Sequence, residues 1–306
     1  MSTLSDAPLT VSPEVADALS SGTPVVALES TIISHGLPKS EALGAARRFE
    51  QILRERDVVP ATIAVLDGRL KAGLSDDELE RVATEELPKL SVRDLPVTLG
   101  RSGSGATTVA STSFIADQAG IRVFATGGLG GVHRGAHQTF DESADLTVLS
   151  KVPITVVSAG VKSILDIPAT LERLESLGVI VLGYGTDEFP GFWLTSSGQP
   201  LDWSVPDAPA VAAVMESREQ LEMCEAILVA NPLPIEEQLD PDVHDRALSE
   251  ALRRAEEKQV EGKDVTPFLL STIVELTGGE SLAVNLKIAE NNISVGADIA
   301  HAWARQ

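Results

Sequence analysis

Short apolar segments alternate with helix-like segments along most of this chain, and this alternation is the feature that most limits its fold. The apolar runs are rich in Val and Ile, and they include VVAL, VFA, ITVV, VIVL and AILVA. Such alternation is typical of α/β proteins, in which helices cover a sheet of mostly parallel strands. The segment ATIAVLDGRLKAGL also predicts a hairpin that turns at Asp67 and Gly68, and therefore an antiparallel pair. We expect a three-layer α/β/α fold with a mixed β-sheet.

The chain is long enough for one large hydrophobic core. It has 306 residues, 43% of them hydrophobic, and no Pro/Ser-rich linker, low-complexity tract or fixed-period repeat interrupts it. The sequence therefore predicts a single α/β catalytic domain over residues 1–306. From about residue 240 to 306 the pattern is almost entirely helical, with breaks at Gly262 and at the pair Gly278 and Gly279. We expect this C-terminal part to pack as a helical cover.

Charge and hydropathy exclude several classes of partner. A net charge of −21 at pH 7 would repel nucleic acid everywhere except at a local basic cluster. A small phosphorylated ligand remains compatible, because glycine-rich turns can supply the few donors that one phosphate needs. The chain has no run of about 18 apolar residues and no signal-peptide pattern at its start, so we expect a cytoplasmic protein with no membrane partner.

The single cysteine, Cys224, is predicted to be a buried small hydrophobe.

Four segments place small or glycine residues and polar groups where an apolar strand is expected to end or a helix to begin. They are VVALESTIISHG, SGSGATTVAS, VFATGGLGGVHRG and VVSAGVKS. Because the carboxyl ends of strands gather along one rim of an α/β sheet, we expect these segments to line one crevice. The glycines permit close approach of the backbone to a ligand, although neither the P-loop nor the dinucleotide pattern is met. Nearby, residues 89–95 are predicted as a strand and residues 106–120 as a helix.

Glu29 and Lys162 are the candidate catalytic residues. Glu29 has apolar flanks, and desolvation there would favour its protonated form, which suits a general acid. Its alternative roles are pairing with an arginine or capping a helix. Lys162 is predicted where a strand passes into a helix, and an apolar turn and a helix N-terminus both favour a neutral, nucleophilic amine. A lysine whose stem packs on the sheet while its head reaches water or a phosphate explains the position equally well.

Several residues are candidates for binding an anionic ligand. Thr108 and Val109 lie at a Gly/Ser/Thr turn before a helix, where backbone amides can bind an anion, although ordinary turns share this composition. Lys89 is a second candidate cation, and a strand-edge charge is its alternative explanation. His133 and Arg134 follow the run of four glycines and are further candidates.

The acidic stretch TFDESADL offers a different kind of site. Its carboxylates Asp141, Glu142 and Asp145 suit a hard cation that keeps several waters, such as Mg²⁺ or Mn²⁺, and a helix cap explains them almost as well. The five histidines and one cysteine show no spacing typical of a zinc site.

At these residues the sequence resembles the pseudouridine-5′-phosphate glycosidase family, also called the indigoidine synthase A-like family. The matching segments extend from about residue 24 to residue 292 and include PVVALESTIISHG, VFATGGLGGVHRGA, TFDESADL and VVSAGVKSILD. The resemblance implies a lyase that reversibly cleaves pseudouridine 5′-phosphate to ribose 5-phosphate and uracil. It also implies a homotrimer that binds one Mn²⁺ ion per subunit.

The resemblance also implies a role for individual residues. Glu29 matches the proton donor, Lys162 the covalent nucleophile, and Asp141 the position that holds the metal partly through water. The positions that match substrate-binding residues are Lys89, Thr108, Val109, Ser143, Ala144, Asp145 and Asn285. This chain departs from the family pattern at His137, Gln138 and Glu142, and no role is assigned to these three side chains.

The bond to be cleaved explains why such an enzyme needs a lysine. It joins two carbons, so two carboxylates alone would leave an unstabilised carbanion. A neutral lysine can add to C1′ of the opened sugar after Glu29 donates a proton during ring opening. Two alternatives remain open at this point. One is a Schiff-base aldolase or lyase for another sugar phosphate, and the other is a non-catalytic nucleotide-binding protein.

Overall fold

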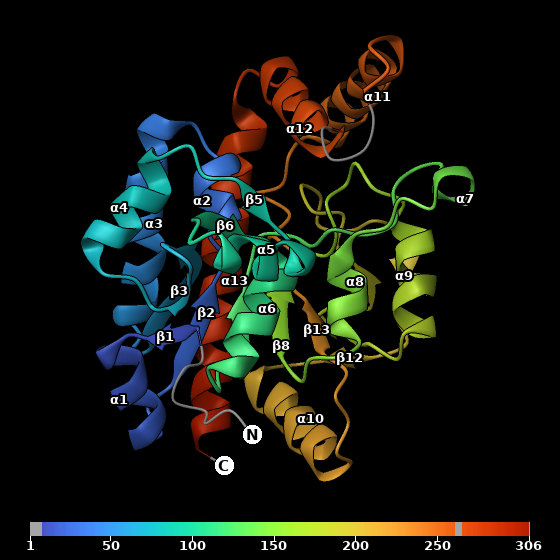
Figure 1. Ribbon diagram of the computed structural model, residues 1–306. Helices are drawn as coiled ribbons and strands as arrows, with labels where there is room; N and C mark the ends of the chain where they lie inside the picture. Colours follow the sequence, from blue (N-terminus) through green and yellow to red (C-terminus); the bar gives the residue numbers. More distant parts are fainter. Residues whose placement is uncertain (1–7, 261–264, 306) are drawn as a thin grey trace.

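A mixed β-sheet forms the centre of the protein. The computed structural model describes residues 8–260 and 265–305 (Figure 1). Within these residues the main path of the sheet has the order β1-β4-β3-β2-β7-β8-β13-β9-β12. Along this path the strands are β1 (Leu9–Val11), β4 (Arg69–Ala72), β3 (Val59–Leu66), β2 (Val25–Leu28), β7 (Val123–Ala125), β8 (Thr155–Ser158), β13 (Ile227–Ala230), β9 (Ile180–Tyr184) and β12 (Ser204–Val205).

The strands from β3 to β12 are parallel, and antiparallel pairs occur on the other side of β3. There, β3 pairs antiparallel with β4 and with β6 (Gly105–Thr107), and β6 pairs with β5 (Lys89–Leu90). The predicted hairpin is confirmed, because Asp67 and Gly68 connect β3 to β4 with φ values of 50° and 74°. A separate two-stranded ribbon joins β10 (Glu188–Phe189) and β11 (Gln199–Pro200). The expected mixed sheet is therefore confirmed.

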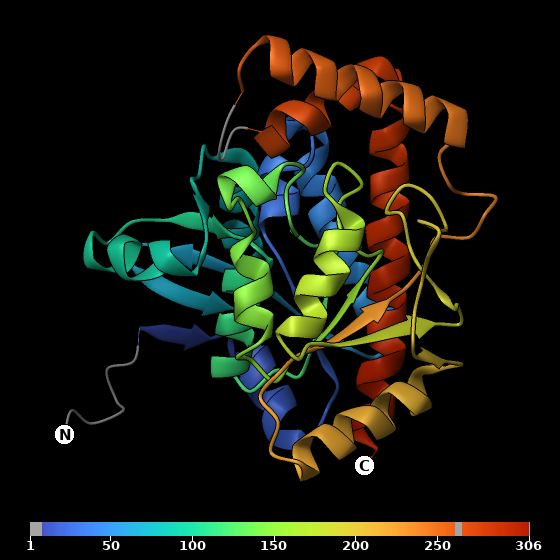
Figure 2. The ribbon, with the colours of Figure 1, turned by 90° about the vertical axis from the view of Figure 1, so that its right-hand side faces the viewer.

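Helices cover both faces of this sheet (Figures 1 and 2). One face carries α1 (Pro13–Ser21), α6 (Val109–Gln118), α8 (Ala144–Leu149) and α9 (Ile167–Ser176). The other face carries α3 (Lys39–Arg54), α10 (Ala208–Gln220) and α13 (Glu280–Ala304). The remaining helices are α2 (Thr31–His35), α4 (Asp76–Thr84), α5 (Leu95–Gly100), α7 (Ala136–Thr139), α11 (Pro241–Glu257) and α12 (Val265–Leu276). The predicted three-layer arrangement is confirmed.

The C-terminal helices differ in their packing, so the predicted cover is only partly correct. Helices α11 and α12 lie at the same end of the molecule as α2, and α10 lies at the opposite end (Figure 2). In contrast, α13 packs directly on β2, β7 and β8, and its residues Ile288, Ile293 and Ala297 are buried. Helix α13 therefore belongs to the helical layer that packs directly on the sheet. The break before it occurs at Gly278 and Gly279, whereas Gly262 lies outside the described residues.

Two predicted elements near the site are wrong in their extent. In the segment 89–95 only Lys89 and Leu90 form a strand, and a 3₁₀ turn follows, because the Asp94 carboxylate accepts a hydrogen bond from the Ser91 amide at 2.8 Å. The predicted helix over residues 106–120 starts later, at Val109. The residues before it form β6, whose end is fixed when the Thr107 amide donates to Ser30 Oγ at 2.8 Å. Both errors arise because these hydrogen bonds cannot be read from the spacing of apolar residues.

Two other expectations concern membranes and the cysteine. No helix in the part of the chain that the structure covers has both the length and the apolar composition to cross a lipid bilayer. Cys224 is exposed, so the expectation that it is buried is wrong. It lies three residues before β13, where the chain is still at the surface.

The close contact between α13 and β7 generates a stability prediction. A Cβ atom at Gly296 would lie 3.2 Å from the Ala125 Cβ, whereas one at Gly44 of α3 would meet no atom within 4 Å. We expect Gly296→Leu to lower the free energy of unfolding by about 1–3 kcal/mol through overpacking. Gly44→Leu should raise it by about 0.5–1 kcal/mol through helix propensity. Urea denaturation checks both values, and equal effects at the two positions would contradict the packing described here.

Candidate functional site

The candidate site lies where β2, β7 and β8 end side by side. These neighbouring parallel strands lead into Glu29, the turn 126–128 and the segment 159–162, respectively. The remaining predicted segment, SGSGATTVAS, lies beside them, because the Thr107 amide donates to Ser30 Oγ. Beyond the strand ends, the segments that follow β7 and β8 stay paired, with Leu129 opposite Val161 in a parallel bridge. The predicted convergence of the four segments is therefore confirmed.

Glu29 is a buried carboxylate held by hydroxyl groups. It directly follows β2, and its side chain accepts hydrogen bonds from Thr31 Oγ1 and from Thr126 Oγ1. No lysine or arginine of the described residues forms a salt bridge with it within 4.0 Å. Pairing with arginine, the alternative explanation for this position, is therefore wrong. The role of Glu29 as a proton donor stays a prediction.

Lys162 is half-buried, and its amine donates to the Gly128 carbonyl oxygen at 2.8 Å. Burial lowers the pKa of Lys162 from its usual value. The nearby charges of Glu29 and Asp145 oppose this shift, and the charge of Lys89 adds to it. A buried amine with a lowered pKa is neutral for a larger share of the time and can then act as a nucleophile.

The expected position of Lys162 at a helix N-terminus is wrong. Helix α9 begins at Ile167, and Asp166 caps it by accepting a hydrogen bond from the Ala169 amide. Lys162 instead lies in the segment that connects β8 to this helix. Its backbone amide donates to the Leu129 carbonyl oxygen at 3.1 Å. Burial therefore explains the lowered pKa without any contribution from the helix dipole.

The glycines between residues 127 and 131 face other parts of the protein. A Cβ atom at Gly128 would collide with the Phe192 ring, and one at Gly131 would lie 2.6 Å from Thr170 Oγ1. A Cβ at Gly130 would collide with the Ser143 side chain. Glycine is required at these three positions because neighbouring segments pack tightly around the turn, whereas a Cβ at Gly127 would meet only Ile32 at 3.7 Å. The expected approach of a ligand to this backbone stays a prediction.

Asp145 joins two of the convergent segments. This buried carboxylate accepts a hydrogen bond from the Ala110 amide at 2.9 Å and another from the Gly130 amide at 2.8 Å. It thereby connects the first turn of α6 to the glycine-rich turn. Ser143 caps α8 by accepting from the Asp145 amide, and Ala144 is exposed at the start of this helix.

The three carboxylates of the acidic stretch do not converge on one point. Asp145 binds backbone amides, and Glu142 forms an ion pair with Arg173 at 2.8 Å. Asp141 is partly exposed, with its carboxylate 3.9 Å from His133 Nδ1. Over residues 8–260 and 265–305, no group of three or more His, Cys, Asp and Glu side chains is arranged to hold a metal ion. The hypothesis that these three carboxylates together bind one cation is therefore wrong. Asp141 and His133 remain as candidate metal ligands.

The other predicted binding residues have varied settings. Lys89 is exposed on β5, and Thr108 caps α6 next to the buried Val109. Arg134 donates to the carbonyl oxygen of Ile164 at 3.1 Å and thus braces the segment after Lys162. Asn285 on α13 accepts a hydrogen bond from the Trp193 indole.

Sequence reasoning missed Thr31, Thr126, Asn231 and Asn292, which surround the convergent turns. Thr31 and Thr126 contact Glu29, and the two asparagines form a buried amide pair at 2.9 Å. Two polar asparagines within the apolar pattern of ILVANP and of the last helix were the available signal. The two asparagines are 61 residues apart in sequence, so the sequence alone could not pair them.

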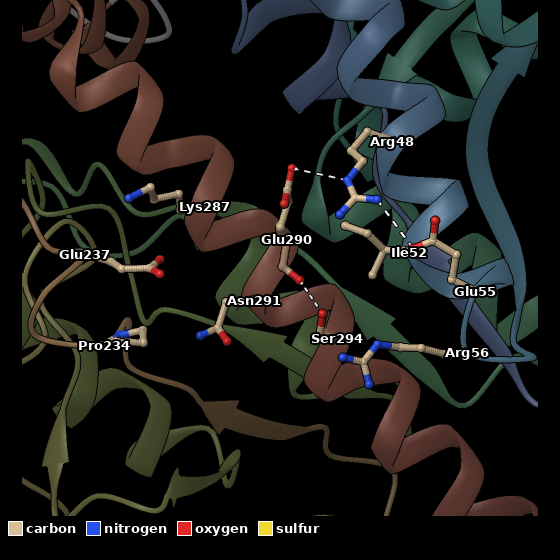
Figure 3. A pocket seen from close by; sticks show the side chains of 10 residues that line it. All are labelled: Arg48, Ile52, Glu55, Arg56, Pro234, Glu237, Lys287, Glu290, Asn291 and Ser294. Atoms are coloured by element: carbon tan, nitrogen blue, oxygen red, sulfur yellow. Dashed lines mark hydrogen bonds and ion pairs between the residues drawn. The ribbon is translucent and has the colours of Figure 1, made fainter.

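A separate pocket lies away from the candidate site. A surface groove of about 470 Å³ runs between α3 and α13 and contains none of the predicted site residues (Figure 3). Its arginines are already compensated: Arg48 contacts Glu55 and Glu290, and Arg56 contacts Asp298. A much smaller space of about 10 Å³, close to the size of one water, touches Glu29 and Thr126.

The family model described as "indigoidine synthase A like protein" matches residues 14–302. The chain belongs to this family. A relative from Frankia alni named pseudouridine-5′-phosphate glycosidase is 57% identical over 97% of this chain and 82% of its own length. A relative of the same name from Salinispora tropica is 58% identical over 95% of this chain and 90% of its own.

Two solved structures of family members have the same fold. One is the prealnumycin C-glycosynthase in complex with ribulose 5-phosphate, with a TM-score of 0.89, 36% identity and 97% of both chains covered. The other is an indigoidine synthase A-like protein from Thermotoga maritima, with a TM-score of 0.88, 37% identity and 98% of both chains covered. The α/β fold derived above is thus shared within the family.

Burial of the Lys162 amine generates a prediction about stability and pH. The folded-state pKa lies below the unfolded value of about 10.5, so the unfolded state binds more protons and folding is penalised below that pH. Lys162→Met removes this penalty and should stabilise the protein more at pH 7 than at pH 10.5. Urea denaturation at the two pH values measures the difference. The exposed Lys151 is the control, and Lys151→Met should show no such dependence. A stability change for Lys162→Met that is equal at both pH values would contradict the lowered pKa.

Proposed function

We propose that this protein is a pseudouridine-5′-phosphate glycosidase, an enzyme that reversibly converts pseudouridine 5′-phosphate and water to ribose 5-phosphate and uracil. The observation that carries the proposal is the buried Lys162 amine, with its lowered pKa, at the strand ends that also hold the buried Glu29. Relatives that are 57% and 58% identical have this enzyme's name. Binding alone does not need a buried amine with a lowered pKa, so a non-catalytic nucleotide-binding protein is disfavoured.

The proposed reaction proceeds through a covalent adduct between lysine and sugar. Glu29 gives a proton to the ring oxygen, the bond between this oxygen and C1′ breaks, and the neutral Lys162 amine forms a bond to C1′ and then loses a proton. Uracil C5 then takes up a proton, the bond between C1′ and C5 breaks, and uracil leaves. Its departure leaves an iminium ion between C1′ and Lys162, which water hydrolyses to free ribose 5-phosphate and the amine.

The surrounding residues support these two steps. The Gly128 carbonyl oxygen orients the Lys162 amine, and as a neutral acceptor it does not require the amine to be charged. Thr31 and Thr126 fix the Glu29 carboxylate from two sides. Lys89 is close enough to Lys162 to affect its pKa, and it is exposed, so it can bind the substrate phosphate. We also assign substrate binding to Thr108, Val109, Ser143 and Asn285.

We also propose one Mn²⁺ ion per subunit, held at Asp141. A partly exposed carboxylate beside an imidazole, with His133 Nδ1 at 3.9 Å, suits a cation that keeps most of its waters. Glu142 is less suitable because Arg173 already pairs with it. When bound, the cation supplies charge that orders water and polar groups of the ligand.

Assembly and location are also part of this proposal. The family resemblance supports a cytoplasmic homotrimer. Large apolar side chains that a subunit contact could cover include Phe140 and Trp203, which are 85% and 69% exposed.

A second candidate is a Schiff-base enzyme that acts on a different sugar phosphate. The observation that favours it is the 36% identical C-glycosynthase, whose solved structure contains ribulose 5-phosphate. Following uracil release by its ultraviolet absorbance separates the two functions. Cleavage of another sugar phosphate without turnover of pseudouridine 5′-phosphate would favour this second candidate.

Trapping the covalent adduct tests the proposed nucleophile. Borohydride with ribose 5-phosphate should reduce the imine and add the mass of the reduced sugar to the wild type, with the label on the peptide containing Lys162. Lys162→Ala should show no label, because the attacking amine is gone. Lys151→Ala is the control and should label as the wild type does. A label that persists in Lys162→Ala would place the nucleophile elsewhere.

Removal of the metal tests the proposed cation site. Dialysis against EDTA should lower uracil release, and Mn²⁺ should restore it. Asp141→Asn should raise the Mn²⁺ concentration needed for half-maximal activity by about tenfold or more. Glu142→Gln removes an adjacent carboxylate that is engaged with Arg173 and should leave this concentration within about twofold. The reverse order of effects would move the cation to Glu142.

A further inference from the structure

Asn292 is a fully buried amide directly behind the candidate site. It lies on α13, and its Nδ2 donates to the Thr126 carbonyl oxygen at 2.7 Å and to the Gly127 carbonyl oxygen at 3.2 Å. Its Oδ1 accepts a hydrogen bond from Asn231 Nδ2 at 2.9 Å. All of these partners belong to segments that follow β7 and β13. The amide therefore connects the inner helix to the strand ends that form the site.

The turn that Asn292 holds contacts both proposed catalytic groups. Thr126 Oγ1 donates to the Glu29 carboxylate, and the Gly128 carbonyl oxygen accepts from the Lys162 amine. Thr126 and Gly128 are separated by only one residue. A change in the direction of this short turn would therefore move the hydrogen-bond partners of the acid and the amine together.

A second connection runs through Asn231. Its backbone amide donates to the Ser158 carbonyl oxygen at 2.9 Å, at the end of the strand that leads to Lys162. The Ala159 amide donates to the same Gly127 carbonyl oxygen that accepts from Asn292. The asparagine pair thus fixes the exits of β7, β8 and β13 relative to one another.

We propose that Asn292 is a positioning residue that sets the placement of Lys162 relative to Glu29 through the turn 126–128. Gly127 and Gly128 have no side chains that could fix the direction of this turn through hydrogen bonds, although the Phe192 ring packs against Gly128. The amide at Asn292 supplies the missing restraint by binding two successive carbonyl oxygens. This role rests on the proposed function, and it assigns Asn292 no contact with the substrate.

Loss of this positioning residue should lower kcat and leave the affinity for the substrate nearly unchanged. Loss of the Asn292 hydrogen bonds leaves the Thr126 and Gly127 carbonyl oxygens with fewer partners and lets the turn shift. A misplacement of about 1 Å can lower the rate about 100-fold. The phosphate is expected to be bound by Lys89, on a different strand, so affinity for the substrate should change little.

The matched experiment compares two neighbouring asparagines on the same helix. Asn292→Leu removes all hydrogen bonds of the buried amide at nearly constant volume. Asn291→Leu removes one hydrogen bond, which Asn291 Nδ2 donates to the Pro232 carbonyl oxygen at 3.2 Å, and leaves the turn untouched. We expect kcat for uracil release to fall about 10- to 100-fold in Asn292→Leu with KM within about threefold. Asn291→Leu should keep both values close to those of the wild type.

Hydrogen exchange supplies a readout that does not depend on activity. The backbone amides of residues 126–131 should exchange faster in Asn292→Leu than in Asn291→Leu. The change Asn231→Ala removes the side-chain donor to Asn292 Oδ1 without adding a charge, and it should give intermediate effects on kcat and on exchange. It provides the same test if Asn292→Leu does not fold.

The outcomes distinguish this inference from the proposed function. A wild type that neither releases uracil nor traps ribose 5-phosphate rejects both, because no reaction exists to be positioned. If the wild type reacts and kcat of the asparagine-pair variants stays within about twofold of it, the positioning role is overturned. Equal losses of kcat in Asn291→Leu and Asn292→Leu also overturn it, because a general weakening of α13 would then be the cause.

Discussion

The site depends on the burial of one amine. Lys162 loses most of its hydration and receives in return a hydrogen bond to the neutral Gly128 carbonyl oxygen, so its protonated form is disfavoured. Glu29 and Asp145 lie near enough to oppose this shift, yet neither forms a direct ion pair with the amine. Both carboxylates are bound by hydroxyl groups or backbone amides of the surrounding turns. These hydrogen bonds fix two carboxylates in place beside an amine that must react in its neutral form.

The surrounding architecture maintains that arrangement from behind. Helix α13 packs on β2, β7 and β8, and Gly296 allows its close approach to β7. Four residues earlier on the same helix, Asn292 binds the turn that follows β7. The longest helix of the described chain thus contributes both an apolar surface and a polar contact to the site. Both contributions are possible because α13 packs directly on the strands.

Local sequence predicted many elements correctly where local contacts decide the structure. The turn at Asp67 and Gly68, for example, depends on residues that are adjacent in the sequence. Predictions failed where distant contacts compete with local preference. For example, β6 occupies the expected first turn of a helix because it pairs with β3. Lys162 was placed at a helix start because the length of the connection to α9 has no clear periodic signal.

The sequence by itself determined the alternation of strands and helices, the segments at the strand ends and the identity of Glu29 and Lys162 as candidate reactive groups. These properties follow from hydrophobic spacing and from the chemistry of single side chains. Only the tertiary structure decided which groups meet. Asp141, Glu142 and Asp145 are neighbours in sequence and point to three different partners. Asn292 and Thr126 are 166 positions apart and share a hydrogen bond. The direction of a side chain depends on the packing of whole elements, which no local pattern contains.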